Sequence, residues 1–217
     1  MPDKIYIYGD SLLKATVPDV DFHYHFHINE VMQVNRSKMG ATIRKGLSLV
    51  RHDLDRGLEA RYALVSYGGN DSDYDWAAID ADPGADHRPN TELPVFADTL
   101  HETLDALRQG GVQPVMMTLP PIDGERYLSF LCRDNLRRDR ILSWLGEPQM
   151  IYRHQELYAD TAAEIALREN IPLIPVRQTF LCNHRLSQLI AADGIHLTMP
   201  GYERLFDTLA DWVKKNI

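Results

Sequence analysis

Short apolar runs alternate along the chain with longer segments in which apolar residues recur every three or four positions. The short runs predict β-strands over residues 4–8, 31–34, 62–67, 112–118 and 171–176. The longer segments predict amphipathic helices over residues 40–58, 93–107, 151–169 and a last stretch that starts near Thr198. Gly110 and Gly111 end the second of these helices, and Pro200 suits the first turn of the last one.

The alternation of strands and helices predicts the fold class. Apolar strands followed by helices are typical of a parallel sheet that is covered on both faces. We therefore expect a three-layer α/β/α fold around a parallel sheet of about five strands. The 217 residues fit one such domain, and no linker or internal repeat divides residues 1–217.

Composition and charge narrow the classes of partner. Hydrophobic residues make up 44% of the chain and charged residues 25%, which is ordinary for a folded protein. A formal net charge of -8 without a long Lys/Arg stripe argues against nucleic acid as a partner. Cys132 and Cys182 lack metal or redox spacing, so we expect two free thiols, with a disulfide between them as the alternative.

The apolar runs also bear on location. None approaches the roughly 20 residues that a membrane span requires. The first apolar stretch contains a charge, so we expect no signal peptide and a cytoplasmic protein, either a monomer or a homo-oligomer.

Candidate catalytic residues lie where the predicted strands end. Ser11 follows the first strand, next to Asp10. A serine becomes a useful nucleophile only when a base lies within hydrogen-bond reach and a third group orients that base. Asp193 and His196, three positions apart before the last helix, are candidates for these roles. Turn formation and helix capping are the alternative roles of such short motifs.

Four motifs, taken together in their order along the chain, resemble the blocks of the SGNH (GDSL-type) hydrolase family. They are Gly9-Asp10-Ser11-Leu12, Asn35-Arg36-Ser37-Lys38-Met39-Gly40, Gly68-Gly69-Asn70-Asp71 and Asp193-Gly194-Ile195-His196-Leu197. The second motif can also be aligned with the family's second block in another register, through Ser37. The first and last motifs lie near the two ends of the chain, so the resemblance covers most of its length.

The resemblance implies a flavodoxin-like sheet and a serine hydrolase site. Ser11 corresponds to the family's nucleophile, and Asp193 and His196 correspond to the acid and base that support it. The backbone N–H groups of Ser11 and Gly40 and the side-chain amide of Asn70 correspond to the oxyanion hole. Donors that already point at the developing negative charge stabilise the transition state without reorganising.

Neither a cofactor nor a metal is expected. His23, His25 and His27 alternate, so they share one face of an extended segment and could bind zinc. No carboxylate or thiolate ligands are obviously paired with them, and the family mechanism needs no metal. An exposed strand or loop face is the simpler interpretation.

Two further segments bear on the substrate. Residues 120–150 mix aromatic residues with arginines and predict a lid or subunit contact, or else a surface helical hairpin with a solvated arginine face. Asp73, Tyr74, Asp75 and Trp76 follow the third motif, and aromatic rings beside carboxylates suit a sugar or another polar alcohol.

We therefore expect a serine carboxylic ester hydrolase that acts through an acyl-enzyme on short-chain or acetyl esters of small molecules or carbohydrates. One alternative is a lipase or thioesterase for longer acyl chains. The other is a non-catalytic, flavodoxin-like ligand-binding domain.

Overall fold

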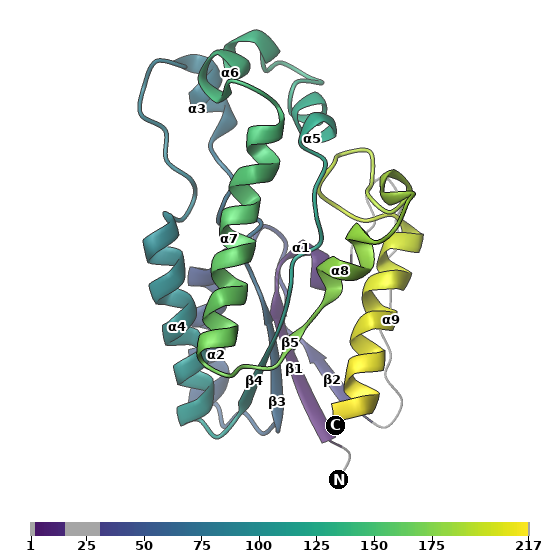
Figure 1. Cartoon of the computed structure of the whole chain (residues 1–217). Helices are drawn as coiled ribbons and strands as arrows, with labels where there is room; N and C mark the ends of the chain where they lie inside the picture. Colours follow the sequence, from purple (N-terminus) through teal and green to yellow (C-terminus); the bar gives the residue numbers. More distant parts are fainter. Residues whose placement is uncertain (1–2, 16–30, 217) are drawn as a thin grey trace.

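A five-stranded parallel sheet forms the centre of the protein (Figure 1). The computed structural model describes residues 3–15 and 31–216. The strands are β1 (Asp3–Gly9), β2 (Val31–Asn35), β3 (Tyr62–Ser66), β4 (Gln113–Met117) and β5 (Leu173–Ile174). They lie in the order β2-β1-β3-β4-β5, and every neighbouring pair is parallel. The carboxyl ends of all strands therefore lie at one edge of the sheet.

Helices cover both faces of this sheet. Those packed against it are α1 (Ser11–Lys14), α2 (Ile43–Asp55), α4 (Leu93–Gln109), α7 (Gln149–Arg168), α8 (Val176–Leu181) and α9 (Met199–Asn216). On one face, Ile5 and Val115 of the sheet share a core with Phe206 of α9. On the other, Val65 shares a core with Leu104 of α4. The three-layer α/β/α prediction is confirmed.

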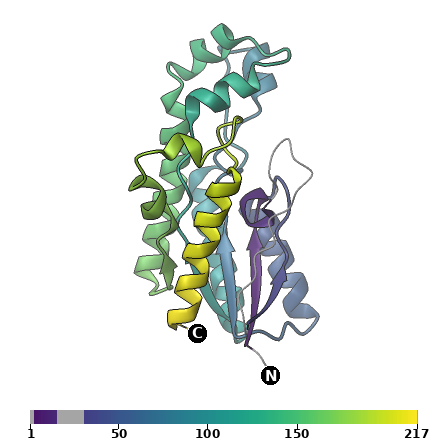
Figure 2. The ribbon, with the colours of Figure 1, turned by 90° about the vertical axis from the view of Figure 1, so that its right-hand side faces the viewer.

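A third hydrophobic cluster lies beyond the carboxyl ends of the strands. It joins α3 (Trp76–Ala81), α5 (Gly124–Leu131), α6 (Arg138–Leu145) and the start of α7. Figures 1 and 2 both show α3, α5 and α6 at the top of the molecule, above the sheet. We call these three helices the cap.

Arginines of α6 and of the residue before it hold the cap together. The guanidinium of Arg137 donates to both carboxylate oxygens of Asp80, at 3.0 and 2.9 Å. Arg140 donates to the backbone carbonyls of Asp80 and Ala81, at 2.5 and 2.7 Å. Arg137 and Arg140 thus bind α3. The interpretation of residues 120–150 as a surface hairpin with a solvated arginine face did not predict this contact.

The structure differs from the prediction in two segments. The expected strand at 171–176 has two residues, because Pro172 and Pro175 flank Leu173 and Ile174 and have no N–H to donate to a ladder. The segment between β3 and the helix predicted from residue 93, for which the sequence pattern predicted no element, contains α3. This helix is too short for its few apolar residues to show a helical period.

The start of α9 matches its prediction. The hydroxyl of Thr198 accepts a hydrogen bond from the backbone N–H of Gly201 at 3.3 Å, as a residue that caps a helix should. A Cβ at Gly201 would lie 2.2 Å from the carbonyl oxygen of Leu189. This approach sets the position of α9 against the segment that leads to His196.

Gly201→Ala is therefore expected to lower the free energy of unfolding by about 1–3 kcal/mol, because backbone cannot move aside as a side chain can. Glu203→Ala, at an exposed position of the same helix, is the control and should change stability by less than about 0.5 kcal/mol. Urea denaturation measures both. Equal stability of the two variants would contradict the close approach.

Candidate active site

Ser11 is the first residue of α1, directly after β1. Asp10 precedes it with extended backbone, and its Oδ1 accepts a hydrogen bond from the backbone N–H of Leu12 at 3.0 Å. This capping bond fixes the turn between strand and helix. The side chain of Ser11 consequently lies at the carboxyl edge of the sheet, where the sequence predicted it.

His196 and Asp193 complete a chain of hydrogen bonds with Ser11. Nε2 of His196 lies 2.9 Å from Oγ of Ser11, and Nδ1 lies 2.6 Å from Oδ2 of Asp193. The order of the groups is hydroxyl, imidazole and carboxylate, which is the order that a serine nucleophile requires. The structure therefore brings Ser11 next to Asp193 and His196, from which most of the sequence separates it.

Asp193 is held by its own loop. Its Oδ1 accepts hydrogen bonds from the backbone N–H groups of Ile195 and His196, at 3.1 and 3.0 Å. Burial alone would raise the pKa of Asp193, but the hydrogen bonds from His196 and Ile195 outweigh burial and lower this pKa below its ordinary value. The carboxylate stays ionised and faces the imidazole.

Gly194 fixes this loop against the cap. Its φ of +82° is strained for any residue with a side chain, and a Cβ would lie 2.5 Å from the carbonyl oxygen of Asp123 and from the backbone nitrogen of Tyr127. The N–H of Asp123 also donates to the carbonyl of Gly194 at 2.8 Å. The start of α5 thus determines where Asp193 and His196 lie.

Asn70 lies after β3, on the cavity beside Ser11. Its Nδ2 donates to Oδ2 of Asp10 at 3.3 Å and to the carbonyl oxygen of Ala41 at 3.2 Å. Gly40 precedes Ala41, has a φ of +65° and is not among the residues that line the cavity. The Asn70 amide therefore connects the Ser11 turn to the turn that contains Gly40.

A cavity of about 370 Å³ opens at Ser11 and His196 and extends beneath the cap. Its walls are mainly aromatic and aliphatic. The lining residues are Asp10, Ser11, Leu12, Gly69, Asn70, Ser72, Asp73, Tyr74, Trp76, Leu119, Pro120, Ile122, Tyr127, Trp144, Leu145, Met150, Ile151, His154, Gln155, Ile195 and His196. Residues 120–150 contribute part of the wall. Asp75 does not line it and instead caps α3 by accepting from the N–H of Ala78 at 3.0 Å.

Comparison with known proteins identifies the family. The model of the GDSL-like lipase/acylhydrolase family matches residues 8–204, which is most of the chain. The chain belongs to this family. Family membership makes the protein a hydrolase of the SGNH/GDSL class. Comparison with curated proteins gave no match.

Solved structures of GDSL-type proteins share the fold. A lipase/acylhydrolase from Enterococcus faecalis is 18% identical with a TM-score of 0.68, over 98% of this chain and 96% of that one. A member of the lipolytic G-D-S-L family from Veillonella parvula is 15% identical with a TM-score of 0.68, over 99% of both chains. A GDSL-like lipase from Bacteroides thetaiotaomicron is 16% identical with a TM-score of 0.65, over 99% of this chain and 89% of that one.

Neither a metal cluster nor a membrane-spanning helix occurs in the part of the chain that the structure describes. Within residues 3–15 and 31–216, no three His, Cys, Asp or Glu side chains lie close enough to hold a metal ion. The histidines at positions 23, 25 and 27 lie outside the described residues. Among the described helices, none has the length and apolar character needed to cross a bilayer. Cys132 and Cys182 are free thiols, as expected.

Sequence reasoning missed His154 and Gln155 of α7, both of which line the cavity. They fell inside a predicted helix and belonged to no motif. A signal was present, because Gln155 lies one helical turn after Ile151 and so shares the buried face. A polar residue on the buried face of an amphipathic helix is therefore a candidate binding group.

The buried carboxyl of Asp10 predicts a dependence of stability on pH. Burial raises the pKa of Asp10 from 3.8 to about 6, so the folded protein binds this proton more tightly than the unfolded chain does. The contribution of Asp10 to stability is therefore least favourable above pH 6 and improves as the pH falls from about 7 to about 4.

Asp10→Asn removes the charge and retains an acceptor for the N–H of Leu12. The new NH₂ group no longer accepts from Nδ2 of Asn70, and this loss does not change with pH. The free energy of unfolding of Asp10→Asn, relative to wild type, should therefore increase by roughly 1–2 kcal/mol between about pH 4 and about pH 7.5. Asp55→Asn, at an exposed position of α2, is the control. A difference between Asp10→Asn and wild type that is constant with pH would contradict the burial of a costly charge.

Proposed function

We propose that the protein is a serine carboxylic ester hydrolase that forms an acyl-enzyme on Ser11, with His196 as base and Asp193 as its partner. The observation that carries the proposal is the continuous hydrogen-bond chain from Oγ of Ser11 through His196 to Asp193, at 2.9 and 2.6 Å. A ligand-binding domain without catalysis has no need for this alignment.

In the first half-reaction, Oγ of Ser11 attacks the ester carbonyl carbon while Nε2 of His196 takes the hydroxyl proton. Asp193 accepts from Nδ1, which keeps the imidazole in the tautomer that can act as a base, and stabilises the imidazolium that forms. The tetrahedral intermediate collapses, the bond to the alcohol oxygen breaks, and His196 returns the proton to that oxygen. The acyl group remains on Ser11.

In the second half-reaction, His196 takes a proton from water as the water oxygen attacks the acyl-enzyme carbonyl. Collapse of this second intermediate breaks the bond to Oγ, and His196 protonates Ser11. The carboxylic acid leaves and the enzyme returns to its starting state. The balance is one ester and one water consumed for one acid and one alcohol formed.

Negative charge on the carbonyl oxygen needs donors beside Ser11. We assign this role to the backbone N–H groups of Ser11 and Gly40 and to the Asn70 amide. The contacts of Asn70 with Asp10 and Ala41 hold the amide next to both turns before any substrate arrives. In this proposal, one of its two N–H groups leaves its present acceptor and donates to the carbonyl oxygen of the substrate.

The size of the cavity favours compact substrates over long acyl chains. A volume of about 370 Å³ lies near the lower end of the range for small-molecule pockets. We therefore favour short-chain or acetyl esters over the alternative of a lipase or thioesterase for long chains. The cap, together with the rest of residues 120–150, acts in this proposal as a lid that limits the space.

Ser11→Ala is expected to abolish hydrolysis of p-nitrophenyl acetate, because among the described residues Ser11 carries the hydroxyl that hydrogen-bonds to the proposed base, His196. A fluorophosphonate should label Ser11 in the wild type and leave Ser11→Ala unlabelled. Ser48→Ala, at an exposed position of α2, is the control and should retain activity and labelling. Mass spectrometry that finds the adduct on another serine would rule out the assignment.

Asn70→Ala tests the oxyanion role. Loss of one donor should lower kcat by about 10²- to 10³-fold, with little change in KM. Fluorophosphonate labelling should still occur, more slowly, and it provides the concentration of active sites. If Asn70 only forms a turn, the variant will melt at a lower temperature but its folded molecules will turn over at nearly the wild-type rate.

A further inference from the structure

Gln155 is a buried polar residue in the cavity wall with an unused acceptor. The residue is 4% exposed and lines the cavity from α7. Its Nε2 lies 3.5 Å from the carbonyl oxygen of Pro120, and its Oε1 has no hydrogen-bond partner among the described residues. Buried acceptors are nearly always paired in proteins, so this oxygen calls for a donor.

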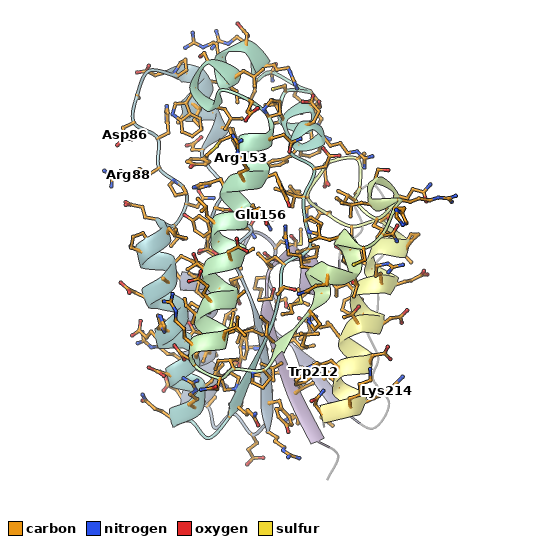
Figure 3. All side chains as sticks on the ribbon, viewed as in Figure 1. Asp86, Arg88, Arg153, Glu156, Trp212 and Lys214 are labelled. Carbon is orange, nitrogen blue, oxygen red and sulfur yellow. The ribbon has the colours of Figure 1, made fainter. Side chains whose placement is uncertain are left out.

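The chemistry of the neighbours fixes the orientation of this amide. Only the NH₂ group can face the carbonyl of Pro120, because two oxygens would repel each other. The oxygen of Gln155 therefore occupies the other side of the amide. The next residue, Glu156, which Figure 3 labels on α7, is not a lining residue. It forms an ion pair with Arg177 of α8.

Two aromatic donors of the wall are already engaged. Nε1 of Trp76 donates to Oδ1 of Asp73 at 2.7 Å, and the hydroxyl of Tyr127 donates to Oδ2 at 2.6 Å. Both carboxylate oxygens thus hold aromatic walls in place. Burial raises the pKa of Asp73, and these hydrogen bonds oppose the increase.

His154 and Tyr74 form a second engaged pair. Nδ1 of His154 lies 2.9 Å from the carbonyl oxygen of Ser72, which can only accept, so Nδ1 carries a proton. Burial lowers the pKa of His154, which favours the neutral ring. Nε2 then accepts from the hydroxyl of Tyr74 at 3.1 Å. These donors too are unavailable to a ligand.

The shape of the wall suits a flat ring. Tyr74 meets Trp76 and Trp144 edge to face, with centroids 5.7 and 4.9 Å apart. Trp76 and Trp144 are themselves 6.5 Å apart at 81°. Aromatic rings arranged in this way offer both faces and edges to another ring.

We propose that the cavity binds the ring of a hydroxyaryl ester and that Oε1 of Gln155 accepts a hydrogen bond from the ring hydroxyl. This inference rests on the proposed ester hydrolysis and names its substrate class. A sugar would bring several hydroxyls to a largely apolar wall in which Gln155 alone, among the described lining residues, has a buried unpartnered side-chain acceptor. A carboxylate or phosphate would bring only acceptors to Gln155 and Asp73.

Two pairs of esters distinguish whether the ring enters with the alcohol or with the acyl group. The first pair is phenyl acetate and 4-hydroxyphenyl acetate, and the second is methyl benzoate and methyl 4-hydroxybenzoate. In one pair, kcat/KM for the hydroxylated ester should be about tenfold higher, after division by the rate of hydrolysis of the same ester by hydroxide, measured at a pH at which its phenol stays protonated. The responding pair identifies the part of the substrate that occupies the cavity.

Gln155→Leu should reduce this ratio to about one, because leucine fills similar space without an acceptor. Gln149→Leu, the same change at an exposed position of α7, should keep the wild-type ratio. Gln155→Met serves as a second variant if the first does not fold. An unchanged ratio in the folded Gln155 variant would overturn the role of Gln155.

Binding to Ser11→Ala separates this inference from the proposed function. NMR titration of that variant with the two responding esters, or with both pairs if none is hydrolysed, should show tighter binding of the hydroxylated member. Preferential binding without hydrolysis in the wild type would reject the esterase and keep the ring site. Equal binding of both members, or faster turnover of acetylated glucose than of all four esters, would reject the ring site.

Discussion

Parallel pairing of β1 with β3 is the constraint on which the site depends. Gly9 lies opposite Ser66 in this register, so the chain leaves both strands at the same level of the sheet. Ser11 and Asn70 follow within a few residues of these two strand ends. A shift of register would displace the two turns from each other and break the contact between Asp10 and Asn70.

Buried carboxylates lie at this same edge of the sheet, and their burial lowers the stability of the folded state. Burial raises the pKa values of both Asp10 and Asp71 to about 6. Each carboxylate binds backbone that shapes the site: Asp10 caps α1, and Asp71 accepts from the N–H of Ile43 at the start of α2 at 3.1 Å. The two buried carboxylates thus lower the stability of the fold but fix the positions of the turns, as in many active sites.

Sequence patterns predicted the sheet and the turn at Ser11 because each depends on local residues. Alternating apolar runs and helical periods predicted the layers. The place of Gly9 to Leu12 after the first predicted strand, together with the three other motifs, predicted the position of Ser11. The cavity could not be predicted in this way. Its walls combine α3, α5, α6 and α7, and the hydrogen bond between Asp73 and Tyr127 joins residues far apart in the sequence. Such pairings depend on how the cap packs, which no single segment encodes.

The separate hydrophobic cluster of the cap has a consequence for divergence among relatives. Ile79, Leu128 and Ile141 are buried in this cluster and outside the two that flank the sheet. Substitutions in this cluster can change the shape of the cap while the strands and their turns keep their packing. One exception limits this freedom, because Gly194 lies against the start of α5 and couples the cap to the loop of His196. Substitutions at the contact with Gly194 would change both the position of His196 and the shape of the cavity. Substitutions elsewhere in the cap would change the shape of the cavity alone, and with it the selectivity for substrates.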